Sequence, residues 1–497
     1  RQYKTIMAYP GDEVVWDFSA MEVSDSNRGV VLDGDYWYFK GFEITKAGDN
    51  GMLLAGNDNL IELMEFNDNQ DTGLQLSRYK TSNADIGSWP SDNLILNCTA
   101  KNNCDNETME NADGFAAKLT CGEGNVFDGC MSYNNSDDGW DLYAKSETGP
   151  IGVVTIRNCI AFRNGYTEFG EGFGDCDGNG FKLGGGGIGT AHIVENCLAF
   201  ENLNCGFTDN NNPKLGSVSK CTAYNNGIGG NGKPNFSCYR CTDDGCDFSA
   251  VLTYVNADNF NAALAPGISS AKIANDKFVG TMENSAYYNG GKYYNVTDKQ
   301  TINNGDKIGN IVTITDDDFI SLEVAPYVSA SEGSGADWFD FHKEWRNADG
   351  ILNTGGFLET KDSSEYKDIG IDFQSIELPI DPIDPPVTTE PIPVTTSSTT
   401  TAVTTEDVPD STTEVTTEVI PDGTKYGDVN TDGSVNIADV VALNMYILNN
   451  EVNAISSEGK ANADCARDNK IDASDSLTLM NYVAMVISAD KLGQTLE

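Results

Sequence analysis

The segment NADGFAAK at residues 111–118 is followed by NNSDDGWDLY at residues 134–143 and by GNGFKLGG at residues 178–185. Each segment contains a glycine that directly precedes a large aromatic residue. The same pattern, with a large apolar residue after the glycine, recurs on both sides, so the glycines of the series are Gly51, Gly73, Gly114, Gly139, Gly180 and Gly206. These segments therefore form an internal repeat.

A second repeat alternates with the first, and in it a small or apolar residue precedes an asparagine by five positions. Its first column is Met64, Cys98, Cys130, Cys159, Cys197 and Cys221, and its second is Asn69, Asn103, Asn135, Asn164, Asn202 and Asn226. The interval varies from 24 residues (Cys197 to Cys221) to 38 residues (Cys159 to Cys197). Helical repeats have a more regular length, whereas coils tolerate turns of variable length, so we predict an all-β chain that folds as a parallel β-helix.

Equivalent residues of successive coils should stack about 4.8 Å apart along the helix axis. The cysteine column then forms a small apolar ladder in the core. The asparagine column forms a hydrogen-bonded ladder inside a turn, as in the asparagine stacks of cross-β structures.

Aligning the glycines places residues of equal offset in neighbouring coils. Asp113 should stack under Asp138, and Asp141 should stack under Lys182. Carboxylates this close, with Asp137 beside them, cannot all remain ionised without a cation. A hard divalent ion with oxygen ligands, most plausibly Ca2+, fits this cluster. The alternative is a set of solvated turn aspartates, which is common in an acidic chain, but the stacking and the nearby lysine favour the metal site.

Two insertions lengthen the same turn, between Cys98 and Gly114 and between Cys159 and Gly180. They belong to the coils that carry Asp113 and Lys182. We expect them to form the wall of a groove beside the site, because long loops of this kind are often functional.

At these residues the chain resembles polysaccharide lyase family 9, which includes calcium-dependent pectate lyases built on a right-handed parallel β-helix. The resemblance covers roughly residues 1–375 and implies that Asp113, Asp137, Asp138 and Asp141 bind Ca2+ and that Lys182 is the catalytic base. It implies β-elimination on pectate or polygalacturonate. Three other functions stay open: a rhamnogalacturonan lyase of the same family, a pectin-type glycoside hydrolase that uses paired aspartates, and a non-catalytic, calcium-dependent carbohydrate-binding module.

Three further residues are candidates for binding the substrate. Lys118 and Lys145 lie at or beyond the ends of the predicted site strands and could contact substrate carboxylates, and Asn179 shares the column of Asp113 and Asp138. Ordinary solvated lysines are an equally good interpretation of the first two.

The excess of acidic over basic residues narrows the range of possible binding partners. The 497 residues include 31 Lys and Arg against 76 Asp and Glu, a formal charge of −45. A nucleic acid is excluded as the main partner, because phosphate binding needs a basic surface. An acidic polymer would be repelled unless bound metal inverts the local field, and calcium removes that contradiction.

The number and positions of the histidines and cysteines argue against histidine-based catalysis and against a complete disulfide framework. The two histidines, His192 and His342, lie far apart, so histidine-based catalysis is improbable and His192 is interpreted as structural. The 13 cysteines are an odd number, which argues against a complete disulfide framework. Cys238, Cys241 and Cys246 form either a local disulfide or metal knot or, more often with such spacing, free core and turn thiols.

We predict three parts along the chain. Residues 1–377 form the β-helix, whose first coils we expect to precede Arg1, and whose residues 241–377 supply the last coils and a C-terminal cap with a short helix in 339–352. Residues 378–425 are a Pro/Thr-rich linker without the apolar content to fold. Residues 426–497 contain two loop-helix units whose acidic loops begin 36 residues apart, at Asp428 and Asp464.

The first of these loops has EF-hand-type spacing, with Gly433 at the sharp turn. Its ligand positions are Asp428, Asn430, Asp432, Ser434 (through its carbonyl), Asn436 and Asp439. The second offers Asp464, Asp468, Lys470 (through its carbonyl), Asp472 and Asp475, with Ala466 in place of one ligand. We expect weaker Ca2+ binding in the second loop.

This duplicated unit resembles a type I dockerin, the module that attaches cellulosomal enzymes to cohesins on a scaffold. The resemblance implies a small α-helical domain, a cohesin partner and a secreted, cellulosome-associated protein. The residues expected to face the cohesin differ between the units, Ile437-Ala438 against Ala473-Ser474, which leaves the choice of cohesin open. No run of the sequence predicts a membrane span, and a monomeric catalytic domain is expected.

Overall fold

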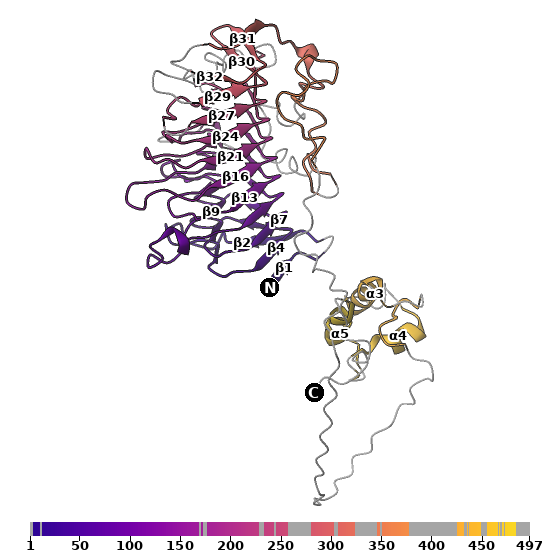
Figure 1. Cartoon of the computed structure of the whole chain (residues 1–497). Helices are drawn as coiled ribbons and strands as arrows, with labels where there is room; N and C mark the ends of the chain where they lie inside the picture. Colours follow the sequence, from indigo (N-terminus) through magenta and orange to yellow (C-terminus); the bar gives the residue numbers. More distant parts are fainter. Residues whose placement is uncertain are drawn as a thin grey trace, which may run out of the picture. The chain divides into compact units, whose positions relative to one another are not determined.

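A computed structural model gives the fold of this chain (Figure 1). It describes residues 3–9, 12–167, 170–171, 176–227, 233–242, 245–256, 280–302, 307–323, 345–347, 350–376, 425–431, 435, 437–448, 455–465, 467, 470–471 and 473–483. The chain divides into two compact units, Arg1–Val387 and Thr388–Glu497. Among the helices in these ranges, none has the length and apolar character needed to cross a membrane.

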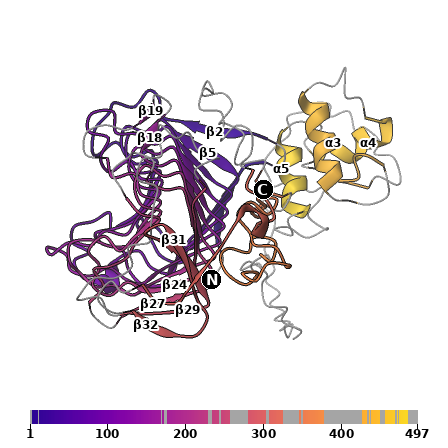
Figure 2. The ribbon, with the colours of Figure 1, turned by 90° about the horizontal axis from the view of Figure 1, so that it is seen from above.

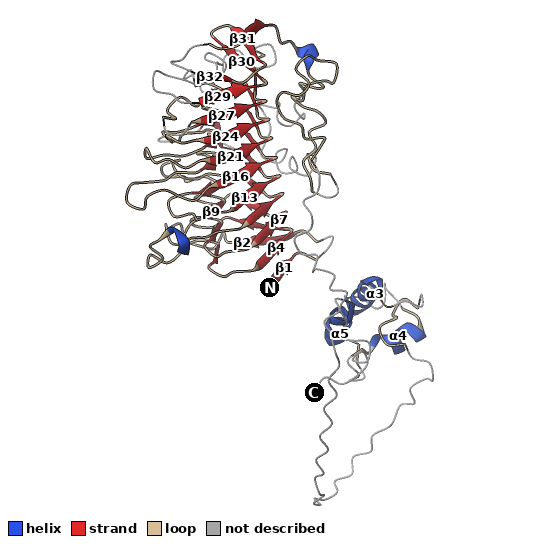
Figure 3. Cartoon of the chain, in the orientation of Figure 1, coloured by secondary structure: helices blue, strands red, loops and turns tan. Residues whose placement is uncertain are grey.

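The first unit is a stack of coils whose strands form three parallel sheets (Figures 1 and 3). Sheet A contains β1 (Lys4–Met7), β4 (Trp37–Lys40), β7 (Leu60–Glu62), β10 (Leu94–Leu96), β13 (Asn125–Asp128), β16 (Val154–Arg157), β21 (His192–Glu195), β24 (Gly216–Ser219), β27 (Cys246–Ser249), β29 (Gly280–Glu283) and β32 (Gln300–Ile302). Sheet B contains β2 (Val14–Asp17), β5 (Phe42–Thr45), β8 (Glu65–Asn67), β11 (Thr99–Lys101), β14 (Met131–Tyr133), β17 (Ile160–Phe162), β22 (Leu198–Phe200), β25 (Thr222–Tyr224), β28 (Leu252–Tyr254), β30 (Ser285–Asn289), β31 (Lys292–Val296) and β33 (Asn310–Val312). Sheet C contains β3 (Val30–Leu32), β6 (Met52–Leu54), β9 (Leu74–Leu76), β12 (Phe115–Ala117), β15 (Trp140–Asp141), β20 (Phe181–Lys182), β23 (Phe207–Thr208) and β26 (Phe236–Ser237).

The predicted parallel β-helix is therefore confirmed, and the view along the stack shows its coils superimposed (Figure 2). A short antiparallel pair, β18 (Tyr166–Thr167) and β19 (Gly170–Glu171), lies in the longer insertion. Two short 3-10 helices, η1 (Ile86–Ser88) and η3 (Asp316–Asp318), lie in turns.

The glycine column sets the register of sheet C. A Cβ on Gly139 would lie 2.5 Å from the carbonyl oxygen of Gly180, and a Cβ on Gly180 would lie 2.6 Å from that of Gly206. Because the backbones approach so closely, only glycine fits at this turn. The aromatic residue after each glycine points into the core, where Trp140 and Phe181 stack with ring centroids 4.7 Å apart.

Both predicted ladders are confirmed. The residues of the cysteine column are fully buried in the core inside the coils. Along the asparagine column the side-chain amide of each residue donates to the amide oxygen of the next, at 2.9 Å from Asn69 to Asn103 and 2.8 Å from Asn103 to Asn135. These bonds satisfy polar groups that the coil turns would otherwise bury without partners.

The C-terminal part of this unit differs from the expectation of a terminal cap. The last strands turn antiparallel, β30 with β31 and β31 with β33. The described residues between 345 and 376 then run along the outer face of sheet B (Figure 1). Arg346 donates to the carbonyl oxygens of Cys98 and Gly129, and the amide of Gly370 donates to Ala250.

This C-terminal segment covers sheet B because the outer face of that sheet is apolar. Outward residues such as Tyr133, Phe162 and Phe200 are fully buried there beneath Trp345 and Phe357. The expected short helix in 339–352 lies mostly outside the described residues, and its described part holds an antiparallel bridge between Arg346 and Leu352.

The second unit contains α3 (Ile437–Leu448), α4 (Ser457–Ala463) and α5 (Ala473–Val483). Helices α3 and α5 follow the two acidic loops, as predicted, whereas α4 was not expected. Val440, Leu443 and Leu479 form a small buried core. The predicted linker lies, except for Lys425, outside the described residues.

Candidate metal and active site

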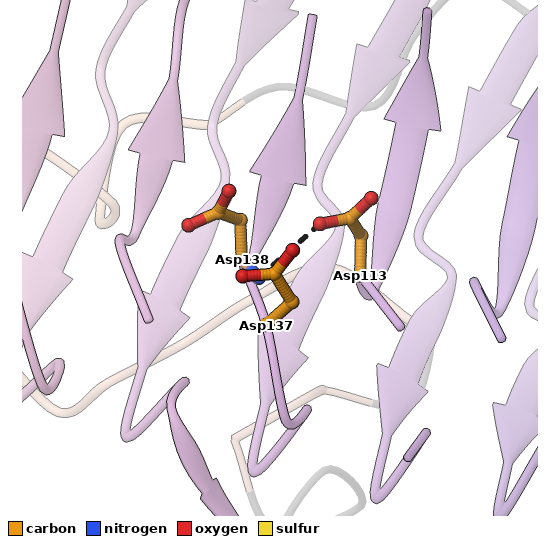
Figure 4. A group of neighbouring side chains, drawn as sticks. All are labelled: Asp113, Asp137 and Asp138. Carbon is orange, nitrogen blue, oxygen red and sulfur yellow. Dashed lines mark hydrogen bonds between the residues drawn. The ribbon is translucent and has the colours of Figure 1, made fainter. Parts of the chain in front are cut away.

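Three buried aspartates gather at the start of the sheet C strands. Asp113 precedes β12, and Asp137 and Asp138 precede β15, so the carboxyl groups come from neighbouring coils (Figure 4). One oxygen from each lies within 4.8 Å of the others, and this trio could hold a metal ion. The backbone amide of Asp138 donates to Asp113 at 3.2 Å, which supports the predicted stacking of these two residues.

A fourth carboxylate and two lysines complete the cluster. Asp141 pairs in register with Lys182, as the glycine alignment predicted. The Lys182 Nζ lies 2.9 Å from the Asp138 carboxylate and 3.9 Å from that of Asp141. The Lys118 Nζ lies 2.6 Å from Asp113 and 3.4 Å from Asp141. Both lysine side chains are about nine-tenths buried, at 7% and 10% exposure.

Lys118 therefore lies inside the carboxylate cluster. We expected it only as a contact for substrate carboxylates. It lies one residue beyond strand β12 and two positions after Ala116, which pairs in register with Asp141, and this period of two is the signal that could have placed it.

The excess of carboxylates over ammonium groups perturbs their protonation. Burial raises the pKa of Asp113 to about 8 and that of Asp137 to about 7, with neighbouring aspartates adding to the effect. Burial also raises the pKa of Asp138. For Lys182, burial acts to lower the pKa, but Asp138 and Asp141 outweigh it, so the pKa is raised. A cluster that binds protons this readily is one that positive charge would stabilise.

The two insertions hold Asp137 in place. The amide of Asn111, from the first insertion, donates to one Asp137 oxygen at 3.0 Å, and the amide of Asp177, from the second, donates to the other at 2.6 Å. Both insertions thus reach the site. The predicted groove stays a prediction.

Asp177 also brings a fifth carboxylate, 3.0 Å from the Lys182 Nζ. Sequence reasoning missed it, since it lies in an insertion and has no register with other coils.

Asn179 orients a ligand candidate. Its backbone and side-chain amides both donate to the same oxygen of Asp138, at 2.7 and 2.8 Å, and its own side-chain oxygen accepts from Cys205. It is buried and engaged within the protein, which makes it a positioning residue in this structure. Lys145 lies in the turn after β15, where it bridges to Gly149.

The remaining predictions concern histidine and cysteine. His192 is buried, its Nδ1 accepts from the amide of Val154, and burial lowers its pKa to about 3, which suits a structural residue. In the described part of the chain, Cys238, Cys241 and Cys246 form no disulfide, and their side chains are buried in the core. Of the two interpretations of these three cysteines, a local knot or core thiols, the structure supports core thiols.

The loops of the second unit are partly described. In the first, Asp428 and Asp439 are buried, and the amide of Asn430 donates to Asp439 at 3.0 Å. In the second, Asp475 is buried, Asp464 ends α4 and Lys470 is exposed. Asp432, Ser434, Asn436, Asp468 and Asp472 lie outside the described residues.

Comparison with known proteins identifies both units. Residues 1–240 match the family described as the Pel9A-like, right handed beta helix region. The β-helical part of this chain is a Pel9A-like domain. Residues 426–484 match the type I dockerin domain, so the C-terminal unit is a dockerin.

Relatives of the Pel9A-like domain include Pectate lyase L of Paenibacillus polymyxa (strain SC2), 51% identical over 224 residues that cover 45% of this chain and 50% of that protein. Pectate lyase L of Thermoclostridium stercorarium is 47% identical over 228 residues, which cover 46% of this chain and 18% of that protein. The chain thus spans half or less of the length of these relatives. A solved structure titled "Rhamnogalacturonan lyase" matches with a TM-score of 0.51 at 23% identity, over 74% of this chain and 81% of that one, and supports the fold alone.

Proposed function

We propose that the Pel9A-like domain is a calcium-dependent pectate lyase that cleaves polyuronate chains by β-elimination. The observation that carries this proposal is the register of Asp141 with Lys182, which sets a buried amine against a cluster of four aspartates. The relatives named Pectate lyase L support the same activity.

The donor set fits Ca2+. The ligand candidates Asp113, Asp137, Asp138 and Asp141 offer only hard carboxylate oxygens, which calcium prefers. One oxygen of Asp141 is buried and has no hydrogen-bond partner among the residues that the structure describes. A cation held by these four aspartates would satisfy that oxygen and offset the cost of burying several charges together.

When bound, calcium would draw electron density from a substrate carboxylate and so acidify the proton on C5 of that uronate. The residues of the chain then perform the proton transfer. A neutral Lys182 takes the C5 proton, the electron pair forms the C4–C5 double bond, and the C4–O bond to the leaving sugar breaks. The leaving oxygen takes a proton from solvent, and the protonated Lys182 returns its proton to solvent.

The carboxylates around Lys182 raise its pKa, which opposes a role as base. A base that works near neutral pH needs a depressed pKa instead. A bound cation would neutralise the charge of Asp138 and Asp141 and so remove most of their attraction for the lysine proton. Burial would then be the main remaining effect, and it lowers the pKa of Lys182. On this account the amine becomes a base only in the metal-loaded site, and activity rises toward alkaline pH.

The decisive experiment measures two products from polygalacturonate. A lyase forms an unsaturated product that absorbs in the ultraviolet, and a hydrolase forms new reducing ends without that absorbance. We expect the unsaturated product with Ca2+ present and none after chelation. Activity that survives the chelator would refute the calcium mechanism, and reducing ends alone would favour the glycoside hydrolase. Parallel assays on rhamnogalacturonan test the alternative substrate.

We also propose that the dockerin binds a cohesin on a scaffold and thereby holds the enzyme outside the cell, in a cellulosome at the plant cell wall. Two buried aspartates, Asp428 in the loop before α3 and Asp439 in the first turn of α3, support calcium binding in the first loop. Calorimetric titration of the whole chain with Ca2+ and then with candidate cohesins tests this assignment.

A further inference from the structure

An arginine lies on the same face of sheet C as the cluster. Arg240 belongs to the turn after β26, and its Nε donates to Asp209 at 2.5 Å. Asp209 is fully buried, and its other oxygen accepts the amides of Tyr239 and Arg240 at 2.8 and 2.6 Å. A buried carboxylate therefore anchors the guanidinium from beneath.

The strand register places this group beside the proposed base. Thr208 in β23 pairs with Lys182 in β20, and neighbouring strands lie about 4.8 Å apart. Phe207 and Phe181 point into the core, so Thr208 and Lys182 share the outer face. The Nη2 of Arg240 donates to the Thr208 hydroxyl at 3.0 Å. The guanidinium therefore lies over the outer face of sheet C, one coil beyond Lys182.

The guanidinium keeps donors available for a ligand. Arginine has five N–H groups, and the contacts above use Nε and Nη2. Within the described part of the chain, no hydrogen bond or ion pair engages Nη1. The side chain is 28% exposed, and the guanidinium carbon lies 4.6 Å from the ring centroid of Tyr239, which fixes its plane.

Two carboxylates lie on the other side of the cluster, and one of them, Asp49, is paired with Arg28 at 3.3 Å. Asp71 lies one coil before Asp113, and Asp49 lies one coil before that. On the C-terminal side of Lys182, Arg240 thus offers positive charge to an anionic chain on this face. A planar arginine held by a carboxylate suits recognition of another carboxylate.

We propose that Arg240 binds the carboxylate of the uronate next to the one from which Lys182 removes a proton. It is a specificity-determining residue that selects free acid over methyl ester in that neighbouring sugar. The proposal rests on the proposed lyase function and names a further contact of the same site.

The test compares Arg240→Gln with Arg157→Gln in the whole chain. Arg157 is the matched control, because its Nε also binds a buried aspartate, Asp128, at 2.7 Å, but on sheet A. For Arg240→Gln we expect KM on polygalacturonate to rise roughly 10-fold or more, as when one charge-assisted hydrogen bond is lost. The rise should be much smaller on highly methyl-esterified pectin. Arg157→Gln should change neither.

A second variant guards against misfolding. The single variant Arg240→Gln leaves the buried Asp209 without its cation. The double variant Arg240→Gln/Asp209→Asn removes both charges, and its KM should rise on polygalacturonate and much less on methyl-esterified pectin, as for Arg240→Gln. An equal change on both substrates, or a loss of kcat with KM unchanged, would give Arg240 a structural role and overturn the proposal.

Affinity electrophoresis in gels that contain polygalacturonate separates this proposal from the proposed function. A wild-type chain without unsaturated product would refute the lyase assignment. Retardation of wild type and Arg157→Gln but not of Arg240→Gln would still support the carboxylate contact, and equal retardation of all three would refute it.

Discussion

At the scale of single residues, Lys182 has a geometry that ordinary ion pairs do not share. Its amine contacts three aspartates, of which Asp138 and Asp141 come from the neighbouring coil and Asp177 comes from an insertion. By contrast, Lys101, which is fully buried, contacts Glu65 at 2.9 Å in sheet B. The carboxylates around Lys182 outnumber the ammonium groups, and a metal would share this excess of negative charge.

We predict that Lys182→Ala lowers kcat on polygalacturonate by at least about 100-fold, since a positioned base usually contributes that much. Calcium binding and folding should be nearly unchanged, because no ligand oxygen is removed. Steady-state rates of product absorbance and calcium titration measure the two effects. Lys101→Ala is the control for burying a lysine elsewhere, and more than about a tenth of wild-type rate in Lys182→Ala would refute the assignment.

The aspartates predict a pH dependence of stability. Asp113 and Asp137 have folded pKa values raised to about 8 and about 7, against about 3.9 in an unfolded chain. Between these limits the folded state binds more protons, so the free energy of unfolding of the metal-free protein falls as pH rises from about 4 to about 8. Calcium reverses this at high pH, where the carboxylates are ionised.

Thermal unfolding of metal-stripped protein between about pH 5 and pH 8 tests this dependence. Wild type should lose more stability toward pH 8 than Asp113→Asn/Asp137→Asn, and added Ca2+ should stabilise wild type more at pH 8 than at pH 5. Parallel curves for the two proteins would contradict the prediction.

At the scale of elements, the asparagine ladder joins coils far apart in sequence. The side-chain oxygen of Asn164 accepts from both amides of Asn135, and its amide donates to Asn202 and to the carbonyl of Ser132. All these groups are fully buried. Each rung therefore holds two neighbouring coils in register.

Asn164→Ala should lower the free energy of unfolding by about 2 to 4 kcal/mol, because buried groups on Asn135 and Ser132 lose their partners. Urea unfolding measures this. Asn106→Ala is the control, since Asn106 is exposed and its amide donates to the side chain of Gln70, so it should cost less than about 0.5 kcal/mol. Equal losses would show that the ladder adds no stability.

The ladders also explain how much could be predicted from the sequence. Gly139 and Gly180 mark a turn where no side chain fits, so aligning them yielded the true register and the pairing of Asp141 with Lys182. Residues outside any column carried no such constraint, which is why Asp177 and Arg240 were missed.

The sequence also contains a pattern that predicts a covered outer face on sheet B. The outward residues Tyr133, Phe162 and Phe200 are aromatic in successive coils, which a solvent-facing sheet would rarely carry. That pattern indicates a covered face, but periodicity cannot say which later segment covers it.

At the scale of the whole molecule, the proposed lyase activity and the proposed attachment to a scaffold belong to separate units. The Pel9A-like domain has a continuous core of stacked coils, whereas the dockerin has a core of a few residues around Val440 and Leu479. So small a core gives little stability alone. We expect the dockerin to depend on calcium at Asp428 and Asp439 for its folding.

We predict that deleting residues 425–497 leaves activity on soluble polygalacturonate unchanged and abolishes Ca2+-dependent cohesin binding. The truncation falls in the segment predicted as an extended spacer of about 48 residues, and every residue of the proposed lyase site lies before it. On insoluble cell wall with scaffold present, only the full chain should gain from the high local concentration. Product absorbance on both substrates and pull-down with a cohesin measure the effects.

The full chain with Asp428→Ala/Asp439→Ala is the matched control for this truncation. It keeps the length of the chain but loses two calcium ligands of the first loop, and it should behave like the truncated chain. Lost activity of the truncated chain on soluble substrate would mean that the dockerin contributes to the catalytic fold.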